Sequence, residues 1–427
     1  MAGAATTPRI VQLATIISDS VGRLNNDLSS MGISTPSFDE GAPLSLPDDV
    51  SNDRDVILDA AAELFDILLD PLALIMYHGA HANSACLQAI ARFGIAKMVP
   101  IGGKIPFSSI AEKTGLTEDM TRRLLRFAMT MRIFREPEPG FVAHTKASTV
   151  LSDDNMNSWL GAGTEEMWPA AVRMVDALQR WPNASEPNET GFQLANNTNE
   201  SIYSVISANP ARGRRFANSM VVHATNPAFS ADHMINSFDW AALGLAQLVD
   251  VGGSRGHIAI ELAKKFGNLT AVVQDRGEIV AGAEADLPVQ LQGRLTFMPH
   301  DIFSPQPVKA DIFLLRWILH NWSDKYCVLI LRALLPALRP GARVLVAETC
   351  MPEPGEVALW KEKDHRVFDM TMAAAFNGKE RTKKEWEALF LQADPRFVLE
   401  GVAEPKGSAL ALLTVVFDED RKAADSV

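Results

Sequence analysis

Residues Leu248 to Gly256 read LVDVGGSRG and give the strongest indication of the fold. An apolar run ends at Asp250, a glycine cluster follows, and a helical pattern extends from His257 to Phe266. The next apolar run, AVVQD, ends in a second acid at Asp275. A strand that turns into a helix at glycines, with a carboxylate closing the next strand, is typical of a nucleoside-binding α/β fold.

Apolar runs alternate with helical patterns through the C-terminal part of the chain. This alternation predicts an α/β fold with a Rossmann-like parallel sheet and helices on both faces. The expected strands are LAQLVDV, TAVVQD, RLTFMPHD, ADIFLLRW, ARVLVAE and ALLTVVF. Asp250, Asp275, Asp301 and Glu348 each close one of these runs. Because ligands bind at the carboxyl ends of such strands, these acids are candidate site residues.

The first half of the chain predicts mostly helices. The stretch PFSSIAEKTGLTEDMTRRLLRF reads as two helices separated at Gly115, and REPEPGFVAHT reads as a hairpin turned at Pro139-Gly140. Helix, turn, helix and hairpin form a winged-helix plan, which serves either DNA binding or dimerisation. We therefore predict an N-terminal helix and linker over 1–55, a winged-helix-like dimerisation domain over 56–150, a helical substrate-lining region over 151–235 and the Rossmann-like domain over 236–427.

Composition excludes several classes of protein. The chain has 427 residues, 47% hydrophobic and 22% charged, which is typical of a globular protein with more than one domain. A net charge of −12 argues against nucleic acid or an anionic membrane as a partner, since both need clustered basic residues. Three scattered cysteines predict neither a disulfide framework nor a zinc site. The N-terminal MAGAATTPRIVQLATIISDS reads as an amphipathic helix rather than a signal peptide, so we expect a cytoplasmic protein.

The glycine spacing favours S-adenosylmethionine (SAM) over a dinucleotide. A dinucleotide fold has G-x-G-x-x-G, whereas here Asp250 leads a D-x-G-x-x-x-G pattern that includes Gly252 and Gly253. Asp250 could bind the SAM ammonium, backbone N–H groups at the glycines its carboxylate, and Asp275 the ribose hydroxyls. Asp301, in PHDIF, falls where an acid could flank the adenine. Each acid alone also reads as a helix cap or a solvated strand end.

His320 is the candidate catalytic base. It follows the apolar run in LLRWILHNWSD, close to the sheet edge where a methyl donor would lie. A phenol is mostly protonated near neutral pH, so a neutral imidazole within hydrogen-bond reach is a suitable base. Glu348 at the same edge and Glu380 in NGKERTKKEW could fix the imidazole tautomer and stabilise the imidazolium. Glu380 also reads as an ordinary surface charge, since Lys and Arg flank it.

Together these motifs resemble the SAM-dependent O-methyltransferases of plant and fungal secondary metabolism. The resemblance is to the caffeate-type group with a winged-helix dimerisation domain, and the fungal branch looks nearest. It runs from about Ser84 to the C-terminus, through the stretches FGIAKMVP, IAEKTGLTEDMTRRLLR, HTKAS, LVDVGGSRG, VVQDR, HDIF, LRWILHNWSD, VLVAE and NGKERT.

The resemblance implies roles for individual residues. It implies that Gly252, Asp275, Asp301, Ile302 and Arg316 contact SAM and that His320 is the base, with Glu348 and Glu380 as its bracing acids. Arg316 stands where the family commonly has Lys, and Ser254 and Gly277 replace a common glycine and proline. The pattern over 370–377 is one residue shorter than in plant members, which offsets substrate-lining assignments there.

The resemblance also implies a homodimer formed through the N-terminal helices, with a small aromatic substrate. The predicted reaction is methyl transfer from SAM to a phenolic hydroxyl, which leaves S-adenosylhomocysteine and needs no metal. Three alternatives stay open from the sequence. They are an enzyme that retains SAM while it promotes dehydration or a pericyclic step, a winged-helix DNA-binding regulator, and an NAD oxidoreductase.

Overall fold

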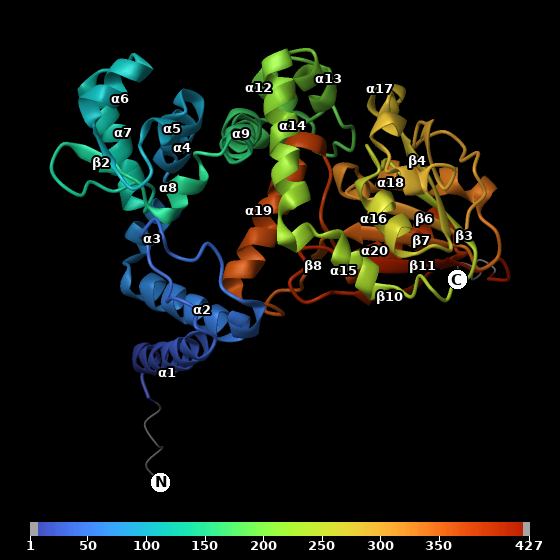
Figure 1. Ribbon diagram of the computed structural model, residues 1–427, viewed down its shortest axis with the longest axis horizontal. Coiled ribbons are helices and arrows are strands. Elements are labelled where there is room, and N and C mark those ends of the chain that lie inside the picture. The colour runs from blue at the N-terminus through green and yellow to red at the C-terminus, as the bar shows by residue number, and fades with distance from the viewer. Residues whose placement is uncertain (1–6, 422–427) are drawn as a thin grey trace, which may run out of the picture. The chain divides into compact units, whose positions relative to one another are not determined.

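A computed structural model of the chain describes residues 7–421 and divides into two compact units (Figure 1). Unit 1 contains the chain up to residue 169 together with 205–222 and 354–364. Unit 2 contains 170–204, 223–353 and the chain from 365 onward. The outermost residues of the first and last predicted regions, 1–6 and 422–427, lie outside the described residues.

Unit 1 begins with a pair of packed helices. Helix α1 spans Arg9–Ser30 and α2 spans Ser51–Leu68, so the predicted linker is shorter than expected at its C-terminal end. Leu13 and Leu28 of α1 are buried, as the amphipathic pattern predicts. Ion pairs from Arg9 to Glu63 and from Arg23 to Asp53 join the exposed edges of the two helices.

The winged-helix plan is present in unit 1 with one difference. Helix α6 (Phe107–Thr114) ends at Gly115, and α7 (Glu118–Thr130) begins after Thr117, whose side chain accepts the Met120 N–H. The predicted hairpin is present as a single antiparallel bridge between Arg135 and Ala143. Its second arm also forms strand β2 (Phe141–Ala143), which pairs antiparallel with β1 (Lys104–Pro106), a strand that was not predicted.

The remaining helical segments before the large sheet range from single turns to the 16-residue α14. They are η1 Asp48–Val50, α3 Pro71–His78, α4 Ala82–Phe93, α5 Ile95–Met98, α8 Lys146–Val150, α9 Asp154–Ala162, η2 Gly163–Met167, α10 Trp168–Val172, α11 Met174–Arg180, α12 Gly191–Asn196, α13 Ile202–Ser207, α14 Pro210–Thr225, η3 Pro227–Phe229 and α15 Ala231–Ser237. No helix among residues 7–421 is both long and apolar enough to cross a membrane.

Unit 2 is built on a seven-stranded sheet in the order β10-β11-β7-β6-β3-β4-β5. The predicted parallel sheet differs at one edge, where the strand predicted at ALLTVVF, β11, runs antiparallel to β7, and β10 runs antiparallel to β11. The other strands are parallel, so their carboxyl ends share one edge. The strands are β3 Ala246–Val251, β4 Leu269–Asp275, β5 Leu295–Pro299, β6 Ile312–Arg316, β7 Arg343–Glu348, β10 Phe397–Ala403 and β11 Ala411–Phe417.

Helices cover both faces of this sheet (Figure 1), which confirms the predicted fold class. On one face, α18 (Asp324–Leu334) and α20 (Lys383–Ala393) pack on the apolar side chains of β6, β7 and β11. On the other face, α15 and α16 (His257–Lys265) pack on β3 and β4. The carboxyl ends of the parallel strands lie at the edge of the sheet, which is where ligands bind in folds of this kind.

The other elements of unit 2 and its connections are short, except for one long helix. They are α17 Gly277–Val280, η4 Ala283–Asp286, η5 Val289–Leu291, η6 Leu319–Asn321, η7 Leu335–Ala337, β8 Cys350–Met351, α19 Leu359–Phe376 and β9 Arg381–Thr382. Strands β8 and β9 pair in parallel and bring the chain after β7 beside the chain that follows α19.

Candidate active site

Three ionisable side chains meet at the carboxyl edge of β6 and β7. His320 lies in η6 just after β6, Glu348 is the last residue of β7, and Glu380 lies between α19 and β9. All three are buried. His320 Nδ1 lies 2.7 Å from Glu380 Oε1 and 3.8 Å from Glu348 Oε2. The surface-charge alternative for Glu380 therefore does not hold, and Glu380 is the hydrogen-bond partner of the imidazole.

Glu348 contacts the backbone that carries the imidazole. Its Oε1 accepts the N–H groups of Ile318 and Leu319 at 2.8 and 2.9 Å. These bonds fix the turn from β6 into η6, on which His320 is mounted. The predicted pair of bracing acids thus divides its work, because Glu380 bonds the ring while Glu348 holds the turn and adds its charge 3.8 Å away.

The charges around His320 decide its protonation. Burial by itself lowers the pKa of His320, but the negative charges of Glu348 and Glu380 outweigh that effect and raise the pKa above its ordinary value. Burial also raises the pKa of Glu348. When Nδ1–H donates to Glu380, the neutral ring keeps its lone pair on Nε2, which is the arrangement that a general base needs.

The same three residues have a composition that suits a metal ion. One ligand atom from each lies within 4.8 Å of the others. The 2.7 Å contact between Nδ1 and Glu380 Oε1 has the length of a charge-assisted hydrogen bond, which accounts for this proximity by itself. That the site works without a metal stays a prediction.

Two residues that sequence reasoning missed hold Glu380 in place. Asp369 of α19 accepts the Glu380 backbone N–H at 2.9 Å. At Gly378 a Cβ atom would lie 2.0 Å from the His320 carbonyl oxygen, so only glycine allows the two chain segments to approach this closely. Gly378 lies within the NGKERT stretch, whereas nothing in the sequence around Asp369 marks it as a partner of Glu380.

Arg381 ties the turn after His320 to the chain that carries Glu380. Its guanidinium is buried and lies 2.8 Å from an oxygen of Asp324 at the start of α18. It also donates to the carbonyl oxygens of Leu319 and Trp322 at 3.3 and 3.0 Å. A buried arginine that fills several acceptors fixes the geometry of the segments that it joins.

The glycine turn after β3 brings the nucleoside-site candidates together. Gly252 turns the chain with φ 71°, and the Gly253 N–H donates to the Gln274 carbonyl at 3.0 Å. A Cβ atom at Gly253 would lie 2.4 Å from the Asp250 carboxyl carbon. The turn therefore packs its backbone directly against the buried carboxyl group of Asp250.

Asp275 is oriented at the end of β4 by two backbone donors. Its Oδ2 accepts the Ser254 N–H at 2.9 Å and its Oδ1 accepts the Arg276 N–H at 2.8 Å. Asp301 lies beyond the end of β5 rather than closing it, and its Oδ1 accepts the Phe303 N–H at 3.1 Å. Asp301 is exposed, while its neighbour Ile302 is half-buried against the core under α18.

Arg316 and Asp250 lie near one another at the ends of β6 and β3. Burial raises the pKa of Asp250 to about 7, and the charge of Arg316 acts against that rise. The Arg316 guanidinium donates to the Phe229 carbonyl at 2.9 Å and lies 4.2 Å from the centre of the Trp317 ring. Trp317 has φ 55°, an uncommon conformation for an aromatic residue, at the junction between β6 and the His320 turn.

The side chains at this turn fit a cationic nucleoside such as SAM. A buried carboxyl group whose ionisation is suppressed, as at Asp250, gains stability from a cation bound beside it. The Asp275 carboxylate is held by two N–H groups and retains acceptor capacity for a pair of ribose hydroxyls. The turn after β3 thus brings together the candidate SAM-binding residues Asp250, Gly252, Gly253 and Asp275.

Comparison with known proteins agrees with this geometry. Residues 184–394 match the O-methyltransferase domain family, and 75–154 match the O-methyltransferase dimerisation domain family. The chain is 41% identical to the O-methyltransferase PaMT of Phomopsis amygdali, over 97% of this chain and 98% of that one. It is 35% identical to the chlorophenol O-methyltransferase of Trichoderma longibrachiatum, over 96% and 91% of the two chains. Among solved structures, OxaC superposes with a TM-score of 0.77 at 19% identity, over 96% of this chain and 99% of that chain.

The chain belongs to the plant and fungal family of SAM-dependent O-methyltransferases. It is a SAM-dependent O-methyltransferase of secondary metabolism with a helical dimerisation domain. The alternatives of a DNA-binding regulator and of an NAD oxidoreductase are thereby set aside.

Proposed function

We propose that this enzyme methylates a phenolic hydroxyl group of a small aromatic natural product, with His320 as the general base. The observation that carries the proposal is the 2.7 Å contact between His320 Nδ1 and Glu380, which leaves Nε2 free to accept a proton. The name of the chlorophenol-methylating relative supports a phenolic acceptor.

SAM, when bound, supplies a methyl carbon made electrophilic by its sulfonium. His320 Nε2 would take the proton of the acceptor hydroxyl as its oxygen bonded that methyl carbon, and SAM would leave as S-adenosylhomocysteine. Glu380 stabilises the imidazolium that forms, and Glu348 adds a second negative charge. We assign SAM binding to Asp250, Gly252, Gly253, Asp275, Asp301, Ile302 and Arg316.

Turnover of methyl-labelled SAM with a panel of phenols, aromatic polyketides and hydroxylated alkaloids tests this proposal. We expect label in a phenolic methyl ether and one equivalent of S-adenosylhomocysteine per product. Conversion of an acceptor without S-adenosylhomocysteine would instead favour the alternative in which SAM is retained during dehydration or a pericyclic step. A panel in which only nonphenolic acceptors gain the label would refute the phenolic assignment.

We further propose a homodimer formed through the N-terminal helices. Large apolar side chains of α3 are exposed in the single chain, and they are Leu72, Ile75, Met76 and Tyr77. Exposed apolar clusters of this kind mark association surfaces. Light scattering should give twice the chain mass for the wild type and a lower mass for Ile75→Lys.

The three free cysteines support a reducing compartment such as the cytoplasm, which imaging of a tagged chain would test.

A further inference from the structure

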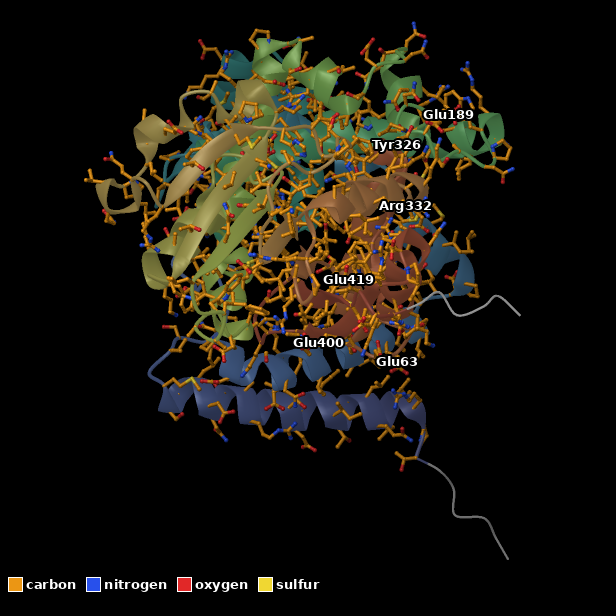
Figure 2. All side chains as sticks on the ribbon, turned by 90° about the vertical axis from the view of Figure 1, so that its right-hand side faces the viewer. Glu63, Glu189, Tyr326, Arg332, Glu400 and Glu419 are labelled. Carbon is orange, nitrogen blue, oxygen red and sulfur yellow. The ribbon has the colours of Figure 1, made fainter. Side chains whose placement is uncertain are left out.

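A short segment, residues 185–190, which we call the strap, is the last part of the connection from α11 to α12 and is bonded to the start of α18. Ser323 Oγ donates to the Ser185 carbonyl at 2.8 Å. The Glu186 carboxylate accepts from Lys325 Nζ and from the Tyr326 hydroxyl, both at 2.5 Å. Figure 2 labels Glu189 of the strap and Tyr326 of α18 in the same upper right part of the view. The strap is thereby fixed to the helix that follows His320.

The strap is also bonded to the end of α19, through Asn377. The Asn377 side-chain amide donates to the Glu186 carbonyl at 2.7 Å and to the Glu189 carbonyl at 3.1 Å. Thr190 Oγ1 also lies 3.5 Å from the Ala375 carbonyl oxygen, which is a weaker contact than the two bonds of Asn377. One half-buried amide group thus uses both of its hydrogens to attach the chain that leads to Glu380.

The position of Asn377 connects these bonds to the imidazole. Asn377 has φ 54°, a left-handed conformation in which it ends α19 and turns the chain toward Glu380. The next residue, Gly378, lies against the His320 carbonyl, where a Cβ would be 2.0 Å away. His320 itself lies in a single 3₁₀ turn rather than in a longer helix or strand, so its distance from Glu380 depends on contacts between the neighbouring segments.

We propose that Asn377 is a positioning residue, which acts through the strap to hold the Glu380 carboxylate against His320. This inference rests on the proposed role of His320 as the base. The strap bonds both the helix after His320 and the turn before Glu380, so it spans the two segments whose separation sets the Nδ1–Oε1 contact. Loss of the Asn377 amide would remove two of the bonds that hold the turn before Glu380, while the strap stayed attached to α18.

The variant Asn377→Gly tests the inference because glycine keeps the left-handed turn and removes only the amide. We expect turnover at saturating SAM to fall about tenfold, with SAM affinity unchanged, since positioning of a base affects the chemical step. Asn197→Gly is the matched control. Asn197 is exposed and has the same left-handed conformation, with φ 49°, at the end of α12, so we expect turnover close to that of the wild type.

The ring titration of His320 gives a readout that a merely structural role would not move. The charged groups that act on the ring are Glu348, Glu380 and Arg381. NMR of imidazole-labelled protein, with His320→Ala to assign the resonance among nine histidines, should show a lower pKa in Asn377→Gly than in the wild type. An unchanged pKa together with unchanged turnover would overturn the inference.

A double-mutant cycle provides the second test. If Asn377 acts through Glu380, Asn377→Gly should cost little further turnover in a Glu380→Gln background, whereas independent effects would multiply. A full additional loss would overturn the inference. Failure of the inference about Asn377 can be distinguished from failure of the proposed function, because wild-type turnover in His320→Ala would refute the base assignment itself. An inactive His320→Ala beside a normal Asn377→Gly would refute only the role of Asn377.

Discussion

His320 Nδ1 and Glu380 Oε1 lie 2.7 Å apart although the two residues are 60 positions apart in the chain. The contact depends on the chain between β7 and β9, which includes β8 and α19 and returns beside β8 where β9 begins. It is supported by the close approach of the Gly378 backbone to the His320 carbonyl and by the Asp369 carboxylate, which accepts the Glu380 N–H. The surroundings of the imidazole are therefore set by tertiary packing.

Gly378→Ala should disrupt the site more than its size suggests. The added Cβ would overlap the His320 carbonyl oxygen, which is backbone and cannot rotate away. We expect a loss of about 1–3 kcal/mol in the free energy of unfolding, together with a large loss of turnover. Urea unfolding and steady-state kinetics measure both. Gly401→Ala in β10, where a Cβ meets nothing within 4 Å, is the control, and equal effects of the two variants would contradict the account.

Asp369 should tolerate asparagine but not alanine. An asparagine can still accept the Glu380 N–H through its side-chain oxygen, whereas alanine leaves that N–H without its partner. We expect Asp369→Asn to keep most of the turnover and Asp369→Ala to lose about tenfold, as for a lost hydrogen bond to a charged group. Asp364→Ala, an exposed change on the same helix, should have no effect. Similar activity of Asp369→Ala and the wild type would show that this bond is unimportant.

The pH dependence of turnover should follow His320. Its raised pKa keeps the imidazole protonated to higher pH than usual, and a protonated ring cannot act as a base. Turnover at saturating SAM should therefore fall as the pH drops through a value above 6.5, the ordinary pKa of histidine. Glu380→Gln removes one of the charges that raise the pKa, so its acidic limb should move to lower pH. A limb at the same pH in both enzymes would assign it to another group.

Asp275→Ala should weaken SAM binding. Two backbone N–H groups hold this carboxylate ready to accept hydroxyl hydrogens, so its loss removes bonds to a charged acceptor. We expect the SAM dissociation constant, measured by calorimetry, to rise roughly ten- to hundredfold. Glu261→Ala on the exposed side of α16 should leave it unchanged. Equal affinity in Asp275→Ala and the wild type would remove Asp275 from the nucleoside site.

The sequence predicted those features of the sheet that depend on local pattern. The apolar runs ending near Asp250, Asp275 and Glu348 became strands because buried parallel strands read as continuous apolar segments. Strand β10 was missed, since Glu400 and Gly401 interrupt its alternation. The direction of β11 was predicted wrongly because an apolar run of this kind carries no sign of strand direction.

The candidate site likewise contains residues that local sequence pattern could place and residues that it could not. His320 and Glu348 could be placed together because both follow parallel strands and so share one edge. Glu380 could not be distinguished from a surface charge, since its burial depends on where α19 ends. The contacts of Asn377 with the strap arise between segments far apart in the chain, and no local pattern records them.

The most direct test of the account is to measure SAM affinity and turnover together in His320→Ala. The nucleoside candidates Asp250 and Asp275 lie on β3 and β4, whereas His320 follows β6, so affinity should stay within about threefold of the wild type. Turnover should fall by roughly 10²–10⁴, the usual contribution of a general base. Turnover near the wild-type rate, with SAM binding intact, would contradict the central claim that this imidazole accepts the proton.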